Sequence, residues 1–225
     1  MKPWKMEAPE TPKAYREGIP LQEAAKEALK TGGDVQCMRF AQDELSGVVG
    51  GILDFSECRF ERCTFGALEL KRMGFIDCVF EQCEISNQRF ADTGFRRVCF
   101  RGCRMTGVEF LNGALTDVQF EQCALDYLAM GDSKLERVAF QNCPMWESQW
   151  TNVRLGAVAL RDSDLTASQW DNTPMKGLDG TTCKLDGIRV SLYDLRGLKV
   201  TEIQALSLAG LLGIEIVPDD LPSVH

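Results

Sequence analysis

Ten cysteines are the residues of this chain with the most chemistry open to them, because thiolates bind metals, form disulfides and act as nucleophiles. Metal sites bring cysteines and histidines together at short spacings, and the sequence contains neither a C-x-x-C pair nor a Cys/His cluster. The single histidine is His225, so no internal Ser-His or Cys-His pair is available for nucleophilic catalysis. We therefore expect no metal, no cofactor and free thiols throughout.

Other catalytic motifs are also missing from the sequence. Neither a GxxxxGKS/T loop nor a GxGxxG run is present to hold phosphates. Carboxylate pairs such as Asp162 and Asp164 stand at polar positions of a regular pattern, where a solvated surface is expected rather than a concave site. We predict that the protein is not an enzyme.

The pattern that holds these residues has a period of five. Large apolar residues recur at every fifth position from 40 to 200, and only Gly50 and Gly180 interrupt the series. A second series, two residues earlier, is mostly small or medium-sized, and the other three positions are largely polar. All twelve phenylalanines belong to the first series: Phe40, Phe55, Phe60, Phe65, Phe75, Phe80, Phe90, Phe95, Phe100, Phe110, Phe120 and Phe140.

A period of five fits neither the 3.6-residue repeat of a helix nor the two-residue repeat of a strand. It fits a solenoid in which each pentapeptide forms one side of a four-sided coil and then turns a corner. About eight coils of parallel strands, roughly 4.8 Å apart, would make a rod about 40 Å long with a solid interior. Side chains 20 residues apart would then stack into a column that begins at Phe40 and continues through Phe60, Phe80, Phe100, Phe120 and Phe140.

Eight of the ten cysteines occupy the small inward position, where a thiol packs as a small hydrophobe. Stacked cysteines would have parallel Cβ vectors, which disfavours disulfides. Cys99 falls at an outward position, and Cys37 precedes the point where the register settles. Packing therefore explains most of the thiols.

The ends of the chain depart from the period and divide it into three parts: 1–35, 36–200 and 201–225. Residues 20–31 have the composition and apolar stripe of a helix that caps the first coil, and residues 1–18 are expected to be mobile. After the last coil, Thr201 resembles a helix N-cap, Gly213 would end the helix, and a short strand is predicted over 214–217.

Composition limits the class of partner. The formal net charge is −8 and the sequence pI is about 4.9, which argues against direct binding of nucleic-acid phosphates. No apolar stretch reaches the roughly 18 residues of a membrane span, and the N-terminal residues lack the apolar run of a secretory signal. A cytoplasmic protein without a membrane partner is expected.

The repeat resembles the pentapeptide-repeat family, whose unit is a small residue, any residue, Leu or Phe, and two further residues. Cys78-Val-Phe80-Glu-Gln and Cys103-Arg-Met105-Thr-Gly follow this unit, and the resemblance extends over residues 36–200. It implies an all-β fold, the right-handed quadrilateral β-helix, here with short helical caps at both ends.

The segment 173–217 resembles the C-terminal part of quinolone-resistance (Qnr-type) members, especially those of Gram-positive bacteria. The resemblance implies a homodimer paired end to end and binding to type II topoisomerases, DNA gyrase or topoisomerase IV, through mimicry of duplex DNA. Members from Gram-negative bacteria carry loops that interrupt the coils and help to protect the topoisomerase from quinolones. The unbroken register of this sequence has no such loops. The implied dimer interface comprises Ala205, Leu208, Leu211, Leu212, Ile214 and Ile216.

Sorting outward residues with the period of 20 places most acidic charge on the face through positions 45, 65 and 85. Six carboxylates against Arg104 and Lys184 give this face a net charge of −4, whereas the other faces lie between −1 and +1. Three interpretations stay open for it: a DNA-mimicking contact with gyrase, a contact with an unrelated partner, or a solvated face with no partner. The six carboxylates are Glu44, Glu84, Asp126, Glu147, Asp164 and Asp186.

Overall fold

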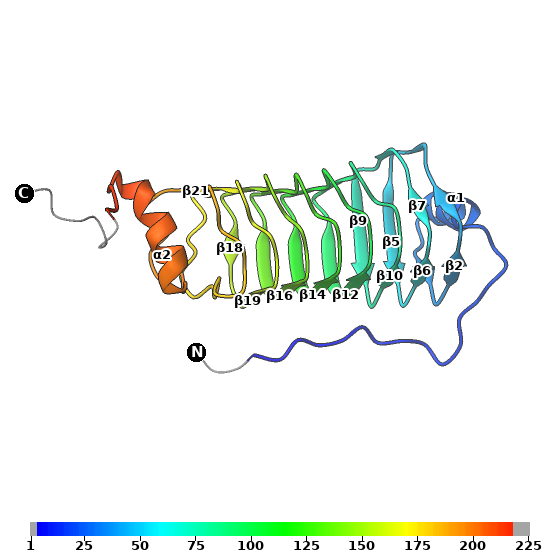
Figure 1. Cartoon of the computed structure of the whole chain (residues 1–225). Coiled ribbons are helices and arrows are strands. Elements are labelled where there is room, and N and C mark those ends of the chain that lie inside the picture. Colours follow the sequence, from blue (N-terminus) through cyan, green and yellow to red (C-terminus); the bar gives the residue numbers. More distant parts are fainter. Residues whose placement is uncertain (1–3, 218–225) are drawn as a thin grey trace, which may run out of the picture.

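The computed structural model describes residues 4–217, which form a rod of stacked coils with one helix at each end (Figure 1). Each strand pairs in parallel with the strand 20 residues later, as Phe60, Phe80 and Phe100 do side by side. The prediction of a parallel pentapeptide-repeat solenoid of about eight coils is confirmed. Its right-handed sense stays a prediction from the sequence.

We number the four sides of the coil as faces I to IV in chain order, starting from the side through Phe40. Face I contains β2 (Arg39–Ala41), β6 (Arg59–Glu61), β10 (Val79–Glu81) and β19 (Val158–Arg161). Face II contains β3 (Glu44–Leu45) and β7 (Thr64–Phe65), followed by isolated bridges at Glu84, Arg104, Ala124, Pro144, Asp164 and Lys184.

Face III contains β4 (Val48–Val49), β8 (Leu68–Glu69), β11 (Arg89–Ala91), β13 (Glu109–Leu111), β15 (Ala129–Gly131), β17 (Gln149–Thr151), β20 (Gln169–Asp171) and β21 (Arg189–Val190). Face IV contains β1 (Val35–Gln36), β5 (Ile52–Ser56), β9 (Arg72–Ile76) and β18 (Arg154–Leu155). Three long strands cross the corner from face IV to face I: β12 (Gly94–Arg101), β14 (Ala114–Glu121) and β16 (Lys134–Gln141).

Corners recur at every fifth residue and place non-glycine residues in the left-handed region. Asn87, Asp92 and Arg97, for example, have φ values of 57°, 52° and 51°. Asn and Asp tolerate this conformation better than most residues, but Arg and Gln also adopt it here. Hydrogen bonds between coils offset the cost of this backbone conformation. Corner amides donate to the next coil, as Arg62 N–H does to the Glu81 carbonyl at 2.8 Å.

The interior is filled by the large apolar series. Phe40 to Phe140 stack at 20-residue intervals with ring centroids 4.5–5.5 Å apart, and Trp150 and Trp170 stack at 4.6 Å on face III. The inward thiols also satisfy backbone groups: Cys83 Sγ donates to the Phe60 carbonyl at 3.4 Å. All ten cysteines are free. The rod is therefore packed through its centre.

The N-terminal cap is α1 (Leu21–Thr31), which buries Leu21 and Ala25 over the first coil and ends at Gly32 with a φ of 69°. The prediction that residues 1–18 are mobile is wrong for the described part. Residues 4–16 run back along the rod beneath face I (Figure 1). Two of their backbone amides donate hydrogen bonds to carboxylates of coils that lie 67 and 110 residues away in the sequence. These distant partners leave no local signal in the sequence.

The C-terminal cap is α2 (Glu202–Ala209), continued by the 3-10 turn η1 (Gly210–Leu212). Thr201 and Gln204 form a capping box, and Gly213 ends the turn with a φ of 68°. The predicted strand over 214–217 is wrong for the single chain, because these residues are irregular and exposed. A strand requires a paired backbone, and α2 separates this segment from the last coil.

Cys99 is outward-facing, as its position predicts, but it is only 2% exposed, whereas Cys37 is half-buried. Something outside the solenoid must cover Cys99. Within residues 4–217, no helix has the length and apolar character needed to cross a bilayer.

Candidate protein-binding surfaces

The filled interior leaves the outside of the rod as the place where a partner can bind. The twelve largest fully buried side chains are two tryptophans and ten phenylalanines of the repeat. A hollow of about 1100 Å³ lies on the outside of face IV, over β5, β9 and β12, and opens to solvent. Within the described residues, no group of three Cys, His, Asp or Glu side chains could hold a metal; His225 lies outside them.

Of the six carboxylates predicted for this face, Glu44, Glu84 and Asp164 lie in register along face II, because the coils pair Glu44 with Thr64, Thr64 with Glu84, and Asp164 with Lys184. Glu147 lies at the corner of faces II and III, with a φ of 52°. The six carboxylates differ in exposure. Glu44, Glu147 and Asp186 are exposed, whereas Glu84, Asp126 and Asp164 are half-buried. Pro144 pairs with Asp164 of the following coil but not with Ala124, because proline has no N–H to donate to the preceding coil.

Two of the six carboxylates are neutralised by cations on the same face. Arg104 Nε lies 3.6 Å from Glu84 Oε2, and Lys184 Nζ lies 2.9 Å from Asp164 Oδ2. Burial raises the pKa of Asp126, although the Trp146 amide donates to its carboxylate at 3.3 Å. Face II therefore presents four carboxylates without an ion pair among residues 4–217: Glu44, Asp126, Glu147 and Asp186.

An exposed aromatic pair lies among these carboxylates. Tyr127, at the corner of faces II and III, contacts Trp146 on face II with ring centroids 4.6 Å apart. The two residues are 46% and 38% exposed. This pair was not predicted from the sequence, although two aromatic residues at outward positions of adjacent coils break the polar pattern. Exposed aromatic residues beside unpaired charge are typical of the centres of protein interfaces.

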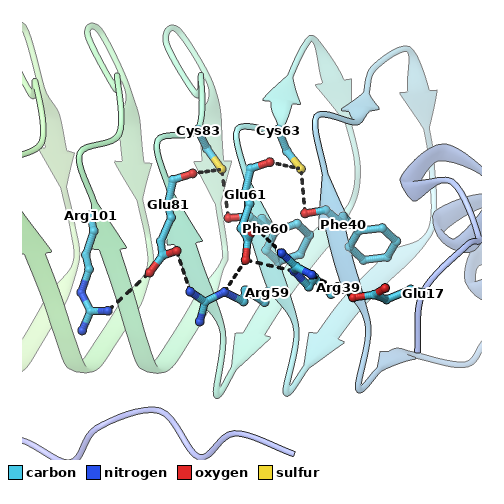
Figure 2. A network of polar contacts seen from close by, with 10 residues as sticks. All are labelled: Glu17, Arg39, Phe40, Arg59, Phe60, Glu61, Cys63, Glu81, Cys83 and Arg101. Atoms are coloured by element: carbon cyan, nitrogen blue, oxygen red, sulfur yellow. Dashed lines mark hydrogen bonds and ion pairs between the residues drawn. The ribbon is translucent and has the colours of Figure 1, made fainter. Parts of the chain in front are cut away.

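Face I differs from face II because its charges are paired with one another (Figure 2). Arg39 bonds Glu17 and Glu61, Arg59 bonds Glu61 and Glu81, and Arg101 approaches Glu81 at 3.5 Å. The hydrogen bonds from Arg39 lower the pKa of Glu61 to about 2. Because the charges of face I are already paired with one another, we expect this face to attract a charged partner only weakly.

The C-terminal end exposes a continuous run of apolar side chains. Of the six predicted interface residues, Leu208 packs partly against the core, and Ala205 is exposed on α2. The other four are 36–55% exposed. Ile203, Leu206 and Val217 enlarge the patch and are 78%, 56% and 65% exposed. Gln204 holds α2 on the rod by donating to the Gly180 and Cys183 carbonyls at 2.9 and 2.7 Å.

The comparison with family models agrees with this geometry. The model described as a pentapeptide repeat region matches residues 53–130 and 94–170, which together make up more than half of the chain. The chain belongs to the pentapeptide-repeat family. Among curated proteins, no match was found.

Solved pentapeptide-repeat structures also align with the chain. A trypsin-treated form of QnrB1, a plasmid-mediated fluoroquinolone resistance protein, is 19% identical with a TM-score of 0.38, over 83% of this chain and 92% of that one. HetL, involved in heterocyst differentiation regulation in the cyanobacterium Nostoc, is 10% identical with a TM-score of 0.29, over 81% and 95%. At these scores neither alignment carries an argument about function.

Proposed function

We propose that the protein is a non-catalytic, cytoplasmic, Qnr-like DNA mimic that binds a type II topoisomerase, DNA gyrase or topoisomerase IV, and protects it from quinolones. The observation that carries the proposal is the charge pattern of face II. Four of its carboxylates have no ion pair among residues 4–217, and two of the four, Asp126 and Glu147, adjoin the exposed aromatic pair. The resemblance of the C-terminal sequence to Qnr-type proteins is the reason for proposing a type II topoisomerase as the partner.

Shape contributes to the mimicry as much as charge. Duplex DNA carries one negative charge per roughly 1.7 Å, so a length of about 40 Å holds on the order of 23 charges, far more than face II. The face instead offers a straight, rigid edge on which carboxylates recur over about 14 Å between Asp126 and Asp186. A DNA-binding groove lined with Lys and Arg would accept such an edge, and Tyr127 and Trp146 would add contact area.

Dimerisation through the C-terminal end would double the length of the rod. The apolar side chains of α2 and residues 211–217 are exposed in the single chain, which is a costly arrangement unless a partner covers them. A second copy would also supply the backbone partner that residues 214–217 lack. We therefore propose a homodimer joined at this end.

A gyrase supercoiling titration with and without ciprofloxacin tests the proposal. We expect the protein to inhibit supercoiling at micromolar concentrations or to restore it in the presence of the drug. A face II variant with four carboxylates neutralised should lose about tenfold in potency. The substitutions are Glu44→Gln, Asp126→Asn, Glu147→Gln and Asp186→Asn.

A control variant changes the same amount of charge on α1 and face III and should retain the potency of the wild type. Its substitutions are Glu23→Gln, Glu27→Gln, Glu69→Gln and Asp171→Asn. If the wild type neither inhibits gyrase nor protects it, the gyrase proposal fails. The second candidate would then apply, a repeat scaffold for an unrelated protein, which is favoured by the absence of inserted loops between the coils of residues 36–200.

A further inference from the structure

The corner between faces IV and I carries an alternating ladder of acidic and basic residues. Arg97 forms two hydrogen bonds of 2.6 Å with the Asp77 carboxylate, and Arg137 bonds Asp117 in the same way at 2.7 and 2.6 Å. The two aspartates are only 7% and 2% exposed. Each carboxylate therefore retains acceptor capacity in a site closed to solvent.

Residues 4–16, which we call the strap, use that capacity. The Glu10 amide donates to Asp77 Oδ1 at 2.9 Å, and the Glu7 amide donates to Asp117 Oδ1 at 3.0 Å. The two aspartates are two coils apart, about 9.6 Å. Three residues of polyproline II span about 9.3 Å, so an N–H at every third residue of such a chain meets an aspartate at every second coil.

The side chains of the strap follow the same period. Met6, Pro9, Pro12 and Tyr15 come at every third residue and are half-buried, whereas the residues between them are exposed. Polyproline II has three residues per turn, so one side of such a chain faces the rod throughout. Arg97 also lies 3.8 Å from the Glu7 carboxylate, which favours an acidic residue at that position.

The course of the strap accounts for the burial of two outward residues of face I. It passes from the coil of Cys37, whose carbonyl accepts the Arg16 amide at 2.7 Å, to the coil of Asp117. Between these points lie Val79 and Cys99, which are 5% and 2% exposed although they face away from the core. Burial raises the pKa of the Cys99 thiol to about 11. Removal of the strap would expose an apolar strip flanked by two acceptor carboxylates.

We propose that this corner, with the adjoining Val79 and Cys99, is a binding surface for extended, proline-containing peptides in the polyproline II conformation, and that the strap occupies it in the free chain. We call the surface that the strap occupies the groove. The groove recognises two backbone N–H groups three residues apart, apolar side chains at the same period and an acidic residue near Arg97. Arg16 fixes one end of the strap through backbone hydrogen bonds with Cys37 and Arg39. Residues 4–15 are held mainly by the two amide–carboxylate hydrogen bonds, the ion pair of Glu7 with Arg97 and half-buried side chains, so they belong to the least stable part of the molecule and can exchange with a partner segment. The groove lies at the corner diagonally opposite Tyr127, so it is separate from the surface proposed for gyrase.

Proline substitution in the full-length chain tests whether the two backbone N–H groups hold the strap in the groove, because proline removes an N–H but is compatible with polyproline II. The variant Glu7→Pro/Glu10→Pro loses both anchors, whereas Lys5→Pro/Lys13→Pro removes N–H groups that make no hydrogen bond within residues 4–217. We expect iodoacetamide to label Cys99 about tenfold faster in the first variant and at the wild-type rate in the second. The buried Cys103 should stay unlabelled in both.

A fluorescent peptide with the sequence of residues 4–18 then tests binding in trans. It should bind full-length Glu7→Pro/Glu10→Pro with a dissociation constant below about 1 mM, and the same peptide with both prolines should bind at least tenfold more weakly. Adding Asp77→Ala/Asp117→Ala to the protein should abolish binding. The neighbouring ladder provides the control, Asp92→Ala/Asp132→Ala, whose carboxylates accept from Asn112 and Asn152 but contact no strap amide.

Three results would overturn the proposal: unchanged Cys99 labelling in the Glu7→Pro/Glu10→Pro variant, labelling of Cys103 together with Cys99, or no peptide binding at about 1 mM. The second result would make the strap an inseparable part of the global fold. The third would show that the groove accepts no peptide in trans.

Discussion

A single phenylalanine of the central column contributes more to stability than any surface charge near it. Phe100 packs between Phe80 and Phe120 with centroid distances of 4.7 and 5.0 Å, and it is only 1% exposed. Phe100→Ala would leave a cavity that the neighbouring coils cannot close, because the strand spacing is fixed. We expect the free energy of unfolding to fall by about 3–5 kcal/mol in urea denaturation.

The control for this prediction lies one residue away. Arg101 is half exposed, and its contacts to Glu81 and Glu121 are both 3.5 Å. Arg101→Ala should change the free energy of unfolding by less than about 1 kcal/mol. Equal losses for both variants would contradict the description of a solid core with a weakly coupled surface.

The corner carboxylates make part of the stability dependent on pH. The hydrogen bonds from Arg137 lower the pKa of Asp117; at Asp77 burial acts in the opposite direction, but the bonds from Arg97 and Glu10 outweigh it and lower the pKa. A lowered folded pKa means that the stabilisation is complete above the unfolded value of about 3.9 and is lost as the pH falls through the folded value.

We therefore expect the free energy of unfolding to decline below about pH 4, with a smaller decline in Asp77→Asn/Asp117→Asn. Urea denaturation at a series of pH values measures this. An identical acid dependence in the variant would show that other groups are responsible.

At the scale of elements, the ends of the chain differ in how completely they are covered. α1 buries its apolar side on the first coil, whereas α2 buries no residue fully and Leu212, in η1, is 55% exposed. Leu212→Asp should halve the mass measured by light scattering, because a charge would be desolvated at the proposed dimer interface. Val49→Asp, which alters a 70% exposed residue on face III, should leave the mass unchanged. A monomeric wild type would contradict the dimer.

The two capping helices were predictable because their signals are local: the apolar stripe before Gly32, and Thr201 before an apolar run ended by Gly213. The strap was not, because its anchors lie on coils 67 and 110 residues away and proline-spaced polar sequence looks like a mobile tail. The strand over 214–217 was predicted from apolar composition alone, which cannot supply the missing neighbouring backbone.

For the whole molecule, the period of five predicted which side chains fill the interior of the rod, but few of the contacts on its surface. Each inward residue stacks on the residues 20 positions before and after it, so only certain residue types fit there. A single sequence is therefore enough to predict the fold. Outward positions are free to vary, so the period placed the six carboxylates on face II but did not show that Arg104 and Lys184 neutralise two of them. Ion pairs depend on rotamers between coils, and the same holds for the contact of Tyr127 with Trp146.

Competition with duplex DNA for the topoisomerase tests most directly whether face II imitates DNA. Labelled protein would be bound to gyrase, and a linear DNA duplex titrated in at constant salt, because both interactions are sensitive to ionic strength. We expect DNA to displace the wild type. The variant with the four face II carboxylates neutralised should bind about tenfold more weakly, whereas the α1 and face III control should keep the wild-type affinity. Simultaneous binding of protein and DNA to gyrase, or equal affinities of the two variants, would contradict the proposal that face II imitates DNA.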